Sequence, residues 1–190
     1  MSRIVVSQFV SLDGVIEDPV GIESLGRGAW SDSASSGAEG DKFNVDEMMD
    51  AEAMLFGRKT YDGYFAAWPS RGGEYADKIN SMPKYVVTST LAEPEWRNTT
   101  LLEGDVADAV RWVKGRHHGD ILIHGSAQLT ATLMEHDLVD EWRLKIYPVV
   151  VGKGKRYFGD PGRAIDMRLT ESRAVGEGVV ILVYEPVRDA

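Results

Sequence analysis

Residues 120–136 read DILIHGSAQLTATLMEH, and their pattern decides the fold. The first five, Asp120–His124, have an apolar centre with β-branched residues, which predicts a buried strand. Gly125 and Ser126 follow as a tight turn, and the segment from Ala127 has the Ala, Leu and Met content of a helix. A strand, a glycine turn and a helix in succession indicate an α/β fold.

The same order of elements occurs earlier in the chain. Residues 41–52 are expected to form a helix, because apolar residues recur there at spacings of three and four. A buried strand over 53–56 follows and ends at the basic turn GRKTY, residues 57–61. A second strand over 84–89 ends in hydroxyl residues, and 105–115 again has the spacing of a helix. This rhythm predicts parallel strands joined by helices.

The two ends of the chain have a different pattern. Residues 4–10 are predicted to form a strand that runs into an Asp-Gly turn, and the Gly- and Ser-rich stretch 19–40 is typical of a functional loop. Beyond residue 137, three long strands without a strong helix among them predict an antiparallel arrangement: 139–151, 164–175 and 178–187. We expect a mixed, mostly parallel sheet with an antiparallel C-terminal hairpin. No linker or repeat interrupts the chain, so we expect a single domain over 1–190.

Composition and charge exclude several classes of function. The net charge of −9 argues against a nucleic-acid or anionic-membrane surface, because both need extended positive potential. The absence of cysteine excludes disulfides, thiolate metal sites and a cysteine nucleophile. No stretch has the roughly 20 apolar residues of a membrane helix, and the N-terminus has no signal-peptide pattern, so we expect a cytoplasmic protein. The histidines lack the spacing of metal ligands, so we expect no metal.

Three predicted strands end in residues that suit a phosphate. Ligands of open α/β sheets bind beside the carboxyl ends of the strands. Here these ends carry Gly57-Arg58-Lys59-Thr60, Thr88-Ser89-Thr90 and Gly125-Ser126, which offer cations, hydroxyls and the N–H groups of a helix start. Each has a structural alternative, such as a solvated loop for Arg58-Lys59 or a plain turn for Gly125-Ser126. Their joint occurrence favours a phosphorylated nucleotide as ligand.

These motifs, with several others, resemble a known family. The chain resembles dihydrofolate reductase and, more closely, the reductase domain of the bifunctional riboflavin-biosynthesis deaminase/reductase and its stand-alone relatives. The matching segments run in order along most of the chain: VVS at 5–7, SLDG at 11–14, LFGRKTY at 55–61, VVTS at 86–89, ILIHGS at 121–126, LVDE at 138–141 and PVVVGKGK at 148–155. The resemblance implies a three-layer dihydrofolate-reductase-like α/β fold, NADPH as cofactor and pairing through a sheet edge. The zinc-binding deaminase half is not expected in a chain without cysteine.

The resemblance also implies roles for individual residues. Arg58 and Thr60, beside Gly57, should contact the NADPH phosphates, with Lys59 at the ribose 2′-phosphate. The further cofactor-binding residues are Thr88 and Ser89 at the adenosine, Gly125, Ser126, Gln128 and Leu129 at the pyrophosphate, and Val6, Ser7, Gly14, Val15 and Ile16 around the nicotinamide. Relatives of the dihydrofolate reductase type have a second glycine in place of Ser126. The serine reduces backbone freedom and adds a hydroxyl.

The substrate side is less well defined. In the resembled family the turn at Gly152-Lys153-Gly154-Lys155 lies near the substrate, where Lys155 could meet a substrate phosphate. A solvated β-turn is the alternative, and the spacing is wrong for a nucleotide triphosphate loop. Asp13, Trp30 and Trp68 are further candidates for substrate binding, although tryptophans are more often core residues.

Reduction of a C=N or C=O bond also needs a proton donor. Asp41 is our candidate, because it lies at the start of the predicted helix on the face of Val45 and Met48 and should lean toward the interior. Other acidic residues of this helix are expected to be solvated: Asp46, Glu47 and Asp50. Two alternatives stay open. One is that Asp41 only caps the helix. The other is that Asp13 or a bound water gives the proton.

We therefore predict an NADPH-dependent reductase of a small heterocycle, like 5-amino-6-(5-phosphoribosylamino)uracil or like a pteridine such as dihydrofolate. The alternative is a protein that keeps NADP(H) binding without catalysis and serves as a sensor or interaction module. The stretch before Asp41 leaves room for this, because the substrate side matches the resembled family least. A homodimer is expected, since apolar strands at 147–151 and 179–184 would otherwise leave an exposed sheet edge.

Overall fold

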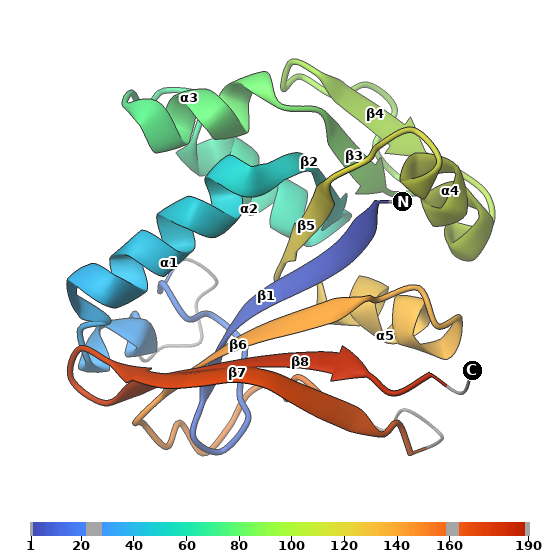
Figure 1. Cartoon of the computed structure of the whole chain (residues 1–190). Coiled ribbons are helices and arrows are strands. Elements are labelled where there is room, and N and C mark those ends of the chain that lie inside the picture. The colour runs from blue at the N-terminus through green and yellow to red at the C-terminus, as the bar shows by residue number, and fades with distance from the viewer. Residues whose placement is uncertain (1, 22–27, 159–163, 189–190) are drawn as a thin grey trace. The chain divides into compact units, whose positions relative to one another are not determined.

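The structure is a computed structural model and describes residues 2–21, 28–158 and 164–188. The strands in these residues are β1 (Arg3–Ser11), β2 (Ala51–Gly57), β3 (Lys84–Val87), β4 (Thr99–Leu102), β5 (Asp120–His124), β6 (Glu141–Tyr147), β7 (Met167–Val175) and β8 (Val179–Pro186) (Figure 1). The helices are α1 (Gly37–Asp50), α2 (Arg58–Ala67), α3 (Glu74–Ser81), α4 (Val106–Lys114) and α5 (Ala127–Glu135), with a short 3-10 helix, η1, at Trp30–Ser33. None of the helices in these ranges is long and apolar enough to cross a membrane.

The strands form one eight-stranded sheet in the order β4-β3-β2-β5-β1-β6-β8-β7. The pairs β3–β4, β2–β3 and β2–β5 are parallel, whereas β8 is antiparallel to both β6 and β7. This confirms the predicted mixed sheet with an antiparallel C-terminal hairpin. Because parallel neighbours point the same way, the carboxyl ends of β3, β2 and β5 lie at one edge of the sheet.

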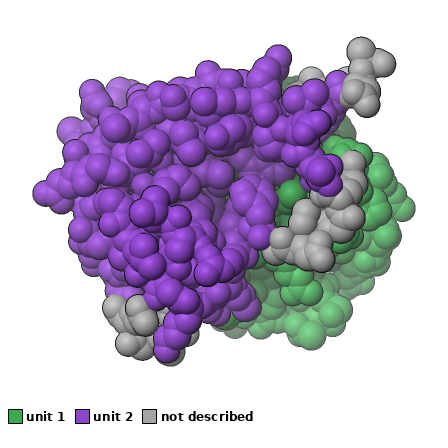
Figure 2. Space-filling model, turned by 90° about the horizontal axis from the view of Figure 1, so that it is seen from below, with its two compact units in different colours: residues 1–6, 44–140 green, residues 7–43, 141–190 purple. Residues whose placement is uncertain are grey.

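The chain divides into two compact units, which are coloured separately in Figure 2. Unit 1 consists of Met1–Val6 and Asn44–Asp140 and contains β2, β3, β4 and β5. Unit 2 consists of Ser7–Phe43 and Glu141–Ala190 and contains β6, β7 and β8. Strand β1 and helix α1 each continue from one unit into the other. Each unit has its own apolar core.

The core of unit 1 is aromatic on one face of its parallel strands. Phe56 of β2 contacts Tyr61 and Tyr64 of α2 and also Trp96, with ring centroids between 5.2 and 6.3 Å apart. Side chains alternate along a strand, so the buried Leu55 points to the opposite face. Helix α2 packs on β2 and β3, α5 also packs on β2, and α4 packs on α5. Helices therefore accompany these strands, as the predicted α/β rhythm requires.

Unit 2 has a core built around Tyr147 of β6. Trp30 of η1 packs edge-on against this ring at a centroid distance of 5.9 Å, and Phe9 of β1 lies 5.3 Å away. Valines of β7 and β8 complete the cluster. Strand β7 is otherwise largely exposed and is the last strand of the sheet. The prediction of a sheet edge at 179–184 is wrong, because β8 lies between β6 and β7.

Some element boundaries differ from the sequence prediction. Helix α1 begins at Gly37 and ends at Asp50 instead of spanning 41–52, because β2 already starts at Ala51. Helix α3 and strand β4 were not expected. The first follows a Gly-Gly pair and contains few apolar residues, and the second has four residues. Such short elements give too weak a periodicity to be recognised in a sequence.

A buried lysine ties the end of α3 to β3. Lys84 Nζ donates hydrogen bonds to the carbonyl oxygens of Ile79 at 2.9 Å, Asn80 at 3.3 Å and Met82 at 2.8 Å. Burial, and to a smaller extent Arg97, lowers the pKa of Lys84 to about 8, so the ammonium group with its three donors still predominates at pH 7. Lys84 thus satisfies carbonyl groups that the end of a helix leaves without partners.

Replacing Lys84 with methionine should destabilise the fold. The Lys84→Met variant keeps an apolar side chain but removes the donor to the Ile79 and Met82 carbonyl groups, whereas the Asn80 carbonyl keeps its bond from Arg97 Nε. The free energy of unfolding should therefore fall by about 2–3 kcal/mol. Urea denaturation at pH 7 measures this loss. Lys78→Met is the matched control, because Lys78 Nζ donates to a single carbonyl, that of Met49. Equal losses in the two variants would contradict the role given to Lys84.

Candidate functional site

The three predicted phosphate-binding strand ends meet in unit 1, where β2 lies between β3 and β5. The Ser126 hydroxyl, just after β5, accepts a hydrogen bond from the N–H of Gly57 at 2.9 Å and donates one to Thr60 Oγ1 at 2.9 Å. On the other side of β2, Arg58 Nη1 donates to Thr90 Oγ1, just after β3, at 3.5 Å. Residues that are far apart in sequence therefore form one group at the carboxyl ends of these strands.

Two helices begin within this group without a side-chain cap. Gly57 precedes α2 and Ser126 precedes α5, and neither residue bonds its own helix through a side chain. The Ser126 hydroxyl is instead used between the turns, by Gly57 and Thr60. A helix N-terminus carries unsatisfied N–H groups and a positive dipole end, which suit an anion such as a phosphate.

The turn between β5 and α5 has a left-handed backbone. Gly125 and Ser126 have φ values of +66° and +56°. A Cβ atom on Gly125 would lie 3.4 Å from Thr60 Oγ1, and one on Gly57 would lie 3.3 Å from Ser126 Oγ. Both glycines therefore occupy positions where a side chain would crowd the hydroxyl groups of the turn.

The predicted cations lie in the first turn of α2. Arg58 is half-buried, and its Nε donates to both carboxylate oxygens of Asp62 at 2.9 Å. This pair fixes the guanidinium group beside Thr90. Lys59 is exposed. The first turn thus presents one fixed and one exposed cation next to the uncapped helix start.

The other predicted cofactor residues of unit 1 surround these turns. Thr88 Oγ1 accepts the N–H groups of Thr90 and Leu91, both at 3.1 Å, so it shapes the turn after β3. Ser89 and Gln128 are exposed, and Leu129 is buried under the first turn of α5. Leu129 thus acts through packing, whereas the exposed side chains could reach a ligand.

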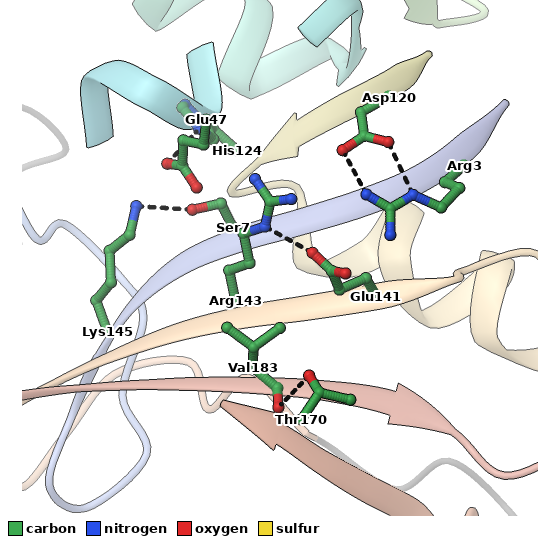
Figure 3. Close-up of polar contacts among 10 residues, drawn as sticks. All are labelled: Arg3, Ser7, Glu47, Asp120, His124, Glu141, Arg143, Lys145, Thr170 and Val183. Carbon is green, nitrogen blue, oxygen red and sulfur yellow. Dashed lines mark hydrogen bonds and ion pairs between the residues drawn. The ribbon is translucent and has the colours of Figure 1, made fainter. Parts of the chain in front are cut away.

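A second polar group of unit 1 lies directly before the Gly125 turn. His124, the last residue of β5, places its Nδ1 atom 2.6 Å from the Tyr64 hydroxyl and its Nε2 atom 3.5 Å from Oε1 of Glu47. Figure 3 shows Glu47 and His124 side by side. Glu47 is only 4% exposed. Burial, with smaller contributions from Tyr75 and Glu47, raises the pKa of Tyr64 well above its usual value, so the phenol keeps its proton.

Glu47, and not Asp41, is the buried carboxylate of α1. Asp41 is exposed and accepts a hydrogen bond from Ser36 Oγ at 2.8 Å, so the expectation that it leans inward is wrong. The expectation that Glu47 is solvated is also wrong, because the helix turns a different face inward from the one that contains Asp41 and Val45. The inward face has helical spacing and consists of Gly40, Phe43, Asn44, Glu47 and Met48. The spacing was visible in the sequence, but a glutamate within it does not suggest burial.

A buried lysine of unit 2 contacts a residue predicted to border the nicotinamide. Lys145 of β6 is 4% exposed and donates to Ser7 Oγ of β1 at 2.8 Å (Figure 3). Its Nζ atom lies 5.3 Å from the ring centroid of Phe9 and 5.4 Å from that of Phe43, within the range of cation–π attraction. Sequence reasoning missed Lys145, because a lysine in a strand is usually exposed.

Asp13 joins two loops of unit 2. Its carboxylate accepts hydrogen bonds from Ser11 Oγ at 2.6 Å and from the N–H groups of Val151 at 3.0 Å and Gly152 at 2.9 Å. The Ser11 bond most of all, together with the backbone bonds, lowers the pKa of Asp13 from 3.8 to about 2, against the opposing effect of desolvation. Through these contacts Asp13 serves as a loop anchor, because it ties the loop after β1 to the one at Val151 and Gly152. Its contact with a substrate stays a prediction.

The two tryptophans predicted to meet a substrate differ in exposure. Trp30 is 5% exposed, and its Nε1–H donates to the carbonyl oxygen of Glu17 at 2.8 Å. Trp68, at the end of α2, is half-buried, and the guanidinium carbon of Arg71 lies 4.8 Å from its ring centroid. Trp30 is therefore a core residue of unit 2, whereas Trp68 keeps part of its ring accessible.

The remaining predicted residues lie along β1 and the loop after it. Val6 and Ile16 are buried, and the N–H of Ile16 donates to the carbonyl oxygen of Lys155 at 2.9 Å. Gly14 has a φ of +85°, as the turn after β1 requires. The Lys155 side chain is exposed. Among the described residues, no three His, Asp or Glu side chains gather in a way that could hold a metal ion.

The mixed sheet and the joined strand ends define an α/β domain of the dihydrofolate-reductase-like class. The sequence matches the family described as RibD C-terminal domain over residues 2–181, and the chain belongs to this family. Membership points to a reductase-type enzyme related to riboflavin biosynthesis.

Two curated relatives are similar over nearly their whole length. The uncharacterized proteins YyaP and YwjB of Bacillus subtilis strain 168 are each 29% identical to this chain, over 187 and 171 residues. The match covers 96% of this chain and 94% of YyaP, and for YwjB it covers 90% of each chain. Neither name assigns an activity.

Two solved structures share the fold. A proposed riboflavin biosynthesis protein from Shewanella sp. PV-4 has a TM-score of 0.79 at 21% identity, and the match covers 98% of this chain and 99% of that one. A pyrimidine reductase-like protein from Corynebacterium diphtheriae has a TM-score of 0.68 at 12% identity, covering 98% of this chain and 92% of that one. At these identities the likeness concerns the fold.

The Asp13 loop anchor predicts a dependence of stability on acid. The folded-state pKa lies below the usual value, so the unfolded chain binds more protons between pH 3.8 and about 2. The stabilisation is present above this window and is lost as the pH falls through it. Urea denaturation from pH 5 down to pH 2 should therefore show that the free energy of unfolding falls more steeply with pH for the wild-type protein than for Asp13→Asn. In Ser11→Ala, which lacks the shortest bond, the folded-state pKa should be less depressed, so the loss should be smaller in total and should end at a higher pH. Parallel curves for all three proteins would contradict the assignment.

Proposed function

We propose that this protein binds NADPH and uses it to reduce a small heterocyclic substrate in the cytoplasm. The substrate is like 5-amino-6-(5-phosphoribosylamino)uracil or like a pteridine such as dihydrofolate. The observation that carries the proposal is the joined pair of turns in unit 1, where Ser126 bonds both Gly57 and Thr60 at the starts of α2 and α5. Family membership, which points to a reductase-type enzyme, supports the same class of reaction.

The residues of the joined turns fit the phosphates of a dinucleotide. Two uncapped helix starts provide N–H donors, and the glycines at 57 and 125 keep the backbone accessible to a ligand. In this proposal the pyrophosphate is held by Gly125, Ser126 and Gln128 and lies over Leu129. Its phosphate oxygens are also contacted by Arg58 and Thr60. Thr88 and Ser89 line the adenosine. When bound, NADPH supplies a hydride to the substrate.

Lys59 supports NADPH over NADH. Its side chain is exposed in the first turn of α2, next to the fixed guanidinium of Arg58. In this proposal it pairs with the ribose 2′-phosphate, which NADH lacks. An exposed lysine is a suitable partner, because its ammonium group is a compact point charge that pairs with a phosphate without the planar geometry that arginine requires.

The residues proposed to border the nicotinamide stay Val6, Ser7, Gly14, Val15 and Ile16. Lys145 Nζ donates to Ser7 Oγ, so a buried ammonium group lies beside the Ser7 hydroxyl. In this proposal that pair faces the carboxamide of the nicotinamide. The proposed substrate residues stay Asp13, Trp30, Trp68 and Lys155. Of these, Trp68 and Lys155 have accessible side chains.

A homodimer is part of the proposal, with β7 as the pairing strand. Strand β7 is exposed along most of its length and is the last strand of the sheet, so its outer backbone groups can pair with a second copy. Its sequence, MRLTESRAV, is mostly polar, which favours pairing through main-chain hydrogen bonds over apolar burial. Light scattering that finds a monomer would reject this part alone.

A titration followed by a turnover assay tests the proposed function. NADPH is added while protein fluorescence is followed, and loss of absorbance by the reduced nicotinamide is then measured with dihydrofolate and with aminouracil-ribitol substrates. The proposal requires saturable binding and turnover on one substrate class. Binding without turnover on the whole panel would favour a non-catalytic NADP(H) sensor, and absence of binding would reject both.

Gly125→Ala should weaken NADPH binding by about tenfold or more, since a lost phosphate hydrogen bond is worth roughly 1.5–3 kcal/mol. The added methyl group would strain a backbone at φ +66° and lie 3.4 Å from Thr60 Oγ1. Gly104→Ala is the control, because Gly104 has a φ of +80° but no heavy atom within 4 Å of the added carbon. It introduces similar backbone strain away from the turn. Equal NADPH affinity in the two variants would contradict the placement of the pyrophosphate.

Asp41→Asn tests the donor predicted from sequence. If Asp41 gives the proton, the variant lowers turnover and leaves NADPH binding intact, because the carboxylate acts on the substrate alone. Fluorescence titration and turnover are measured on the same sample. Loss of both, or of neither, would remove Asp41 from the reaction.

A further inference from the structure

The protons of the contact chain Tyr64–His124–Glu47 can be placed from its chemistry. Tyr64 keeps its proton, and its hydroxyl lies 2.6 Å from His124 Nδ1. In this inference the phenol donates to that nitrogen. A neutral imidazole carries one N–H, which must then be on Nε2. Nε2 lies 3.5 Å from Glu47 Oε1, within ion-pair distance but longer than a strong hydrogen bond. The phenol therefore selects the tautomer that presents an N–H to the glutamate.

The groups packed around this chain in unit 1 are aromatic. The Tyr64 ring lies 6.0 Å from His124, 5.2 Å from Phe56 and 6.3 Å from Trp68, measured between centroids. Tyr75 of α3 is a further titratable neighbour, and burial, with a smaller contribution from Glu47, raises its pKa, so it too stays neutral. Glu47 thus has two neutral phenols and an imidazole among its neighbours in unit 1.

Unit 1 contains a second chain of the same three residue types, at the opposite end of the strands. His117 Nε2 lies 2.9 Å from the Tyr85 hydroxyl, and its Nδ1 lies 3.2 Å from Glu52 Oε2. Glu52 also accepts the N–H of His118 at 2.9 Å, and its side chain is 42% exposed. This chain ties the loop before β5 to the amino ends of β2 and β3. It provides a natural comparison, because ligands bind at the carboxyl ends.

The Glu47 chain lies at the carboxyl end and is attached to the cofactor turns. His124 directly precedes Gly125, and Tyr64 lies one helical turn after Thr60 in α2. We propose that Glu47 is the proton donor of the reduction, held in place by His124 and Tyr64 as positioning residues. This inference rests on the proposed function.

The atoms of the step balance. The carbon of the substrate's C=N or C=O bond receives a hydride with its two electrons from NADPH. Glu47, once it has taken up a proton, gives its O–H proton to the nitrogen or oxygen and returns to the carboxylate form that, in addition to burial, raises the pKa of Tyr64 and Tyr75. The Nε2–H of His124 then stabilises that carboxylate until a proton from water restores the acid. Fixing the His124 tautomer is therefore useful after the transfer, when the charge is on Glu47.

Long-range ¹H–¹⁵N NMR of the histidine side chains in the full chain tests the positioning role of Tyr64 and His124. This measurement does not depend on substrate turnover. The wild-type protein should show His124 with its proton on Nε2, and Tyr64→Phe should convert it to a mixture of tautomers. Tyr85→Phe is the matched control and should change the signals of His117 while leaving those of His124 unaltered. A wild-type His124 protonated on Nδ1, or a His124 spectrum unchanged in Tyr64→Phe, overturns the positioning role.

Kinetics of the same proteins test the donor role. Glu47→Gln should lower kcat by about 100-fold or more, as loss of a general acid does, with NADPH affinity within about twofold. Glu47→Asp, which keeps a carboxyl group, should recover part of the rate. Tyr64→Phe should lower kcat by a smaller factor and shift its pH profile, and Tyr85→Phe and Glu52→Gln should do neither. Tyr64→Phe keeps its ring, so it decides the question even if Glu47→Gln does not fold.

The outcomes separate this inference from the proposed function. A wild-type protein that binds no NADPH or turns over no substrate rejects the proposed reduction, and the donor role with it. Wild-type turnover that survives in Glu47→Gln rejects the donor while the reductase stands. Turnover lost in Asp41→Asn but retained in Glu47→Gln assigns the proton to Asp41 and overturns the inference.

Discussion

The hydroxyl of Ser126 joins the two strand–turn–helix segments on which the candidate site depends. It accepts the N–H at the end of β2 and donates to Thr60 in the first turn of α2. A non-glycine residue in the left-handed region is strained by about 1–2 kcal/mol, which two hydrogen bonds of about 1 kcal/mol each can offset. Because the hydroxyl is used between the turns, it does not cap α5. The same bonds that join the turns after β2 and β5 thus leave a helix start suited to an anion.

The buried ionisable groups differ in the kind of partner they have. Lys84 is surrounded by main-chain carbonyls at the end of one helix, and such partners cannot exchange a proton with it. Glu47 and Lys145 instead contact His124 and Ser7, whose protons can move or rotate. A buried charge among fixed acceptors stabilises a fold, whereas one beside an exchangeable proton is also able to take part in chemistry. This difference separates Lys84, as a structural residue, from the groups proposed to act on a ligand.

The sequence predicted the architecture well where a signal repeats along the chain. The strand at Asp120–His124 and the helix after Ser126 have the predicted limits to within one residue, because an apolar run, a glycine and an apolar helix all agree there. Prediction failed for α3, which is short and has few apolar residues, and for the inner face of α1. The start of α1 depends on contacts of Gly37 and Gly40 with the β7–β8 turn and Val175 of β7, which a local pattern does not contain. The three strand ends that we predict to bind a phosphate stood out in the sequence because their residue types are unusual, and the structure brings them together in unit 1. Glu47 and Lys145 were missed because burial of a charge depends on tertiary contacts.

A crystal structure of the protein in complex with NADPH tests the central claim most directly. The account predicts the pyrophosphate against Gly57, Gly125 and Ser126 at the starts of α2 and α5, with the 2′-phosphate beside Lys59. It also predicts that the Ser126 bonds to Gly57 and Thr60 are kept in the complex. A cofactor bound elsewhere, or a turn that must break these bonds to admit it, would contradict the account.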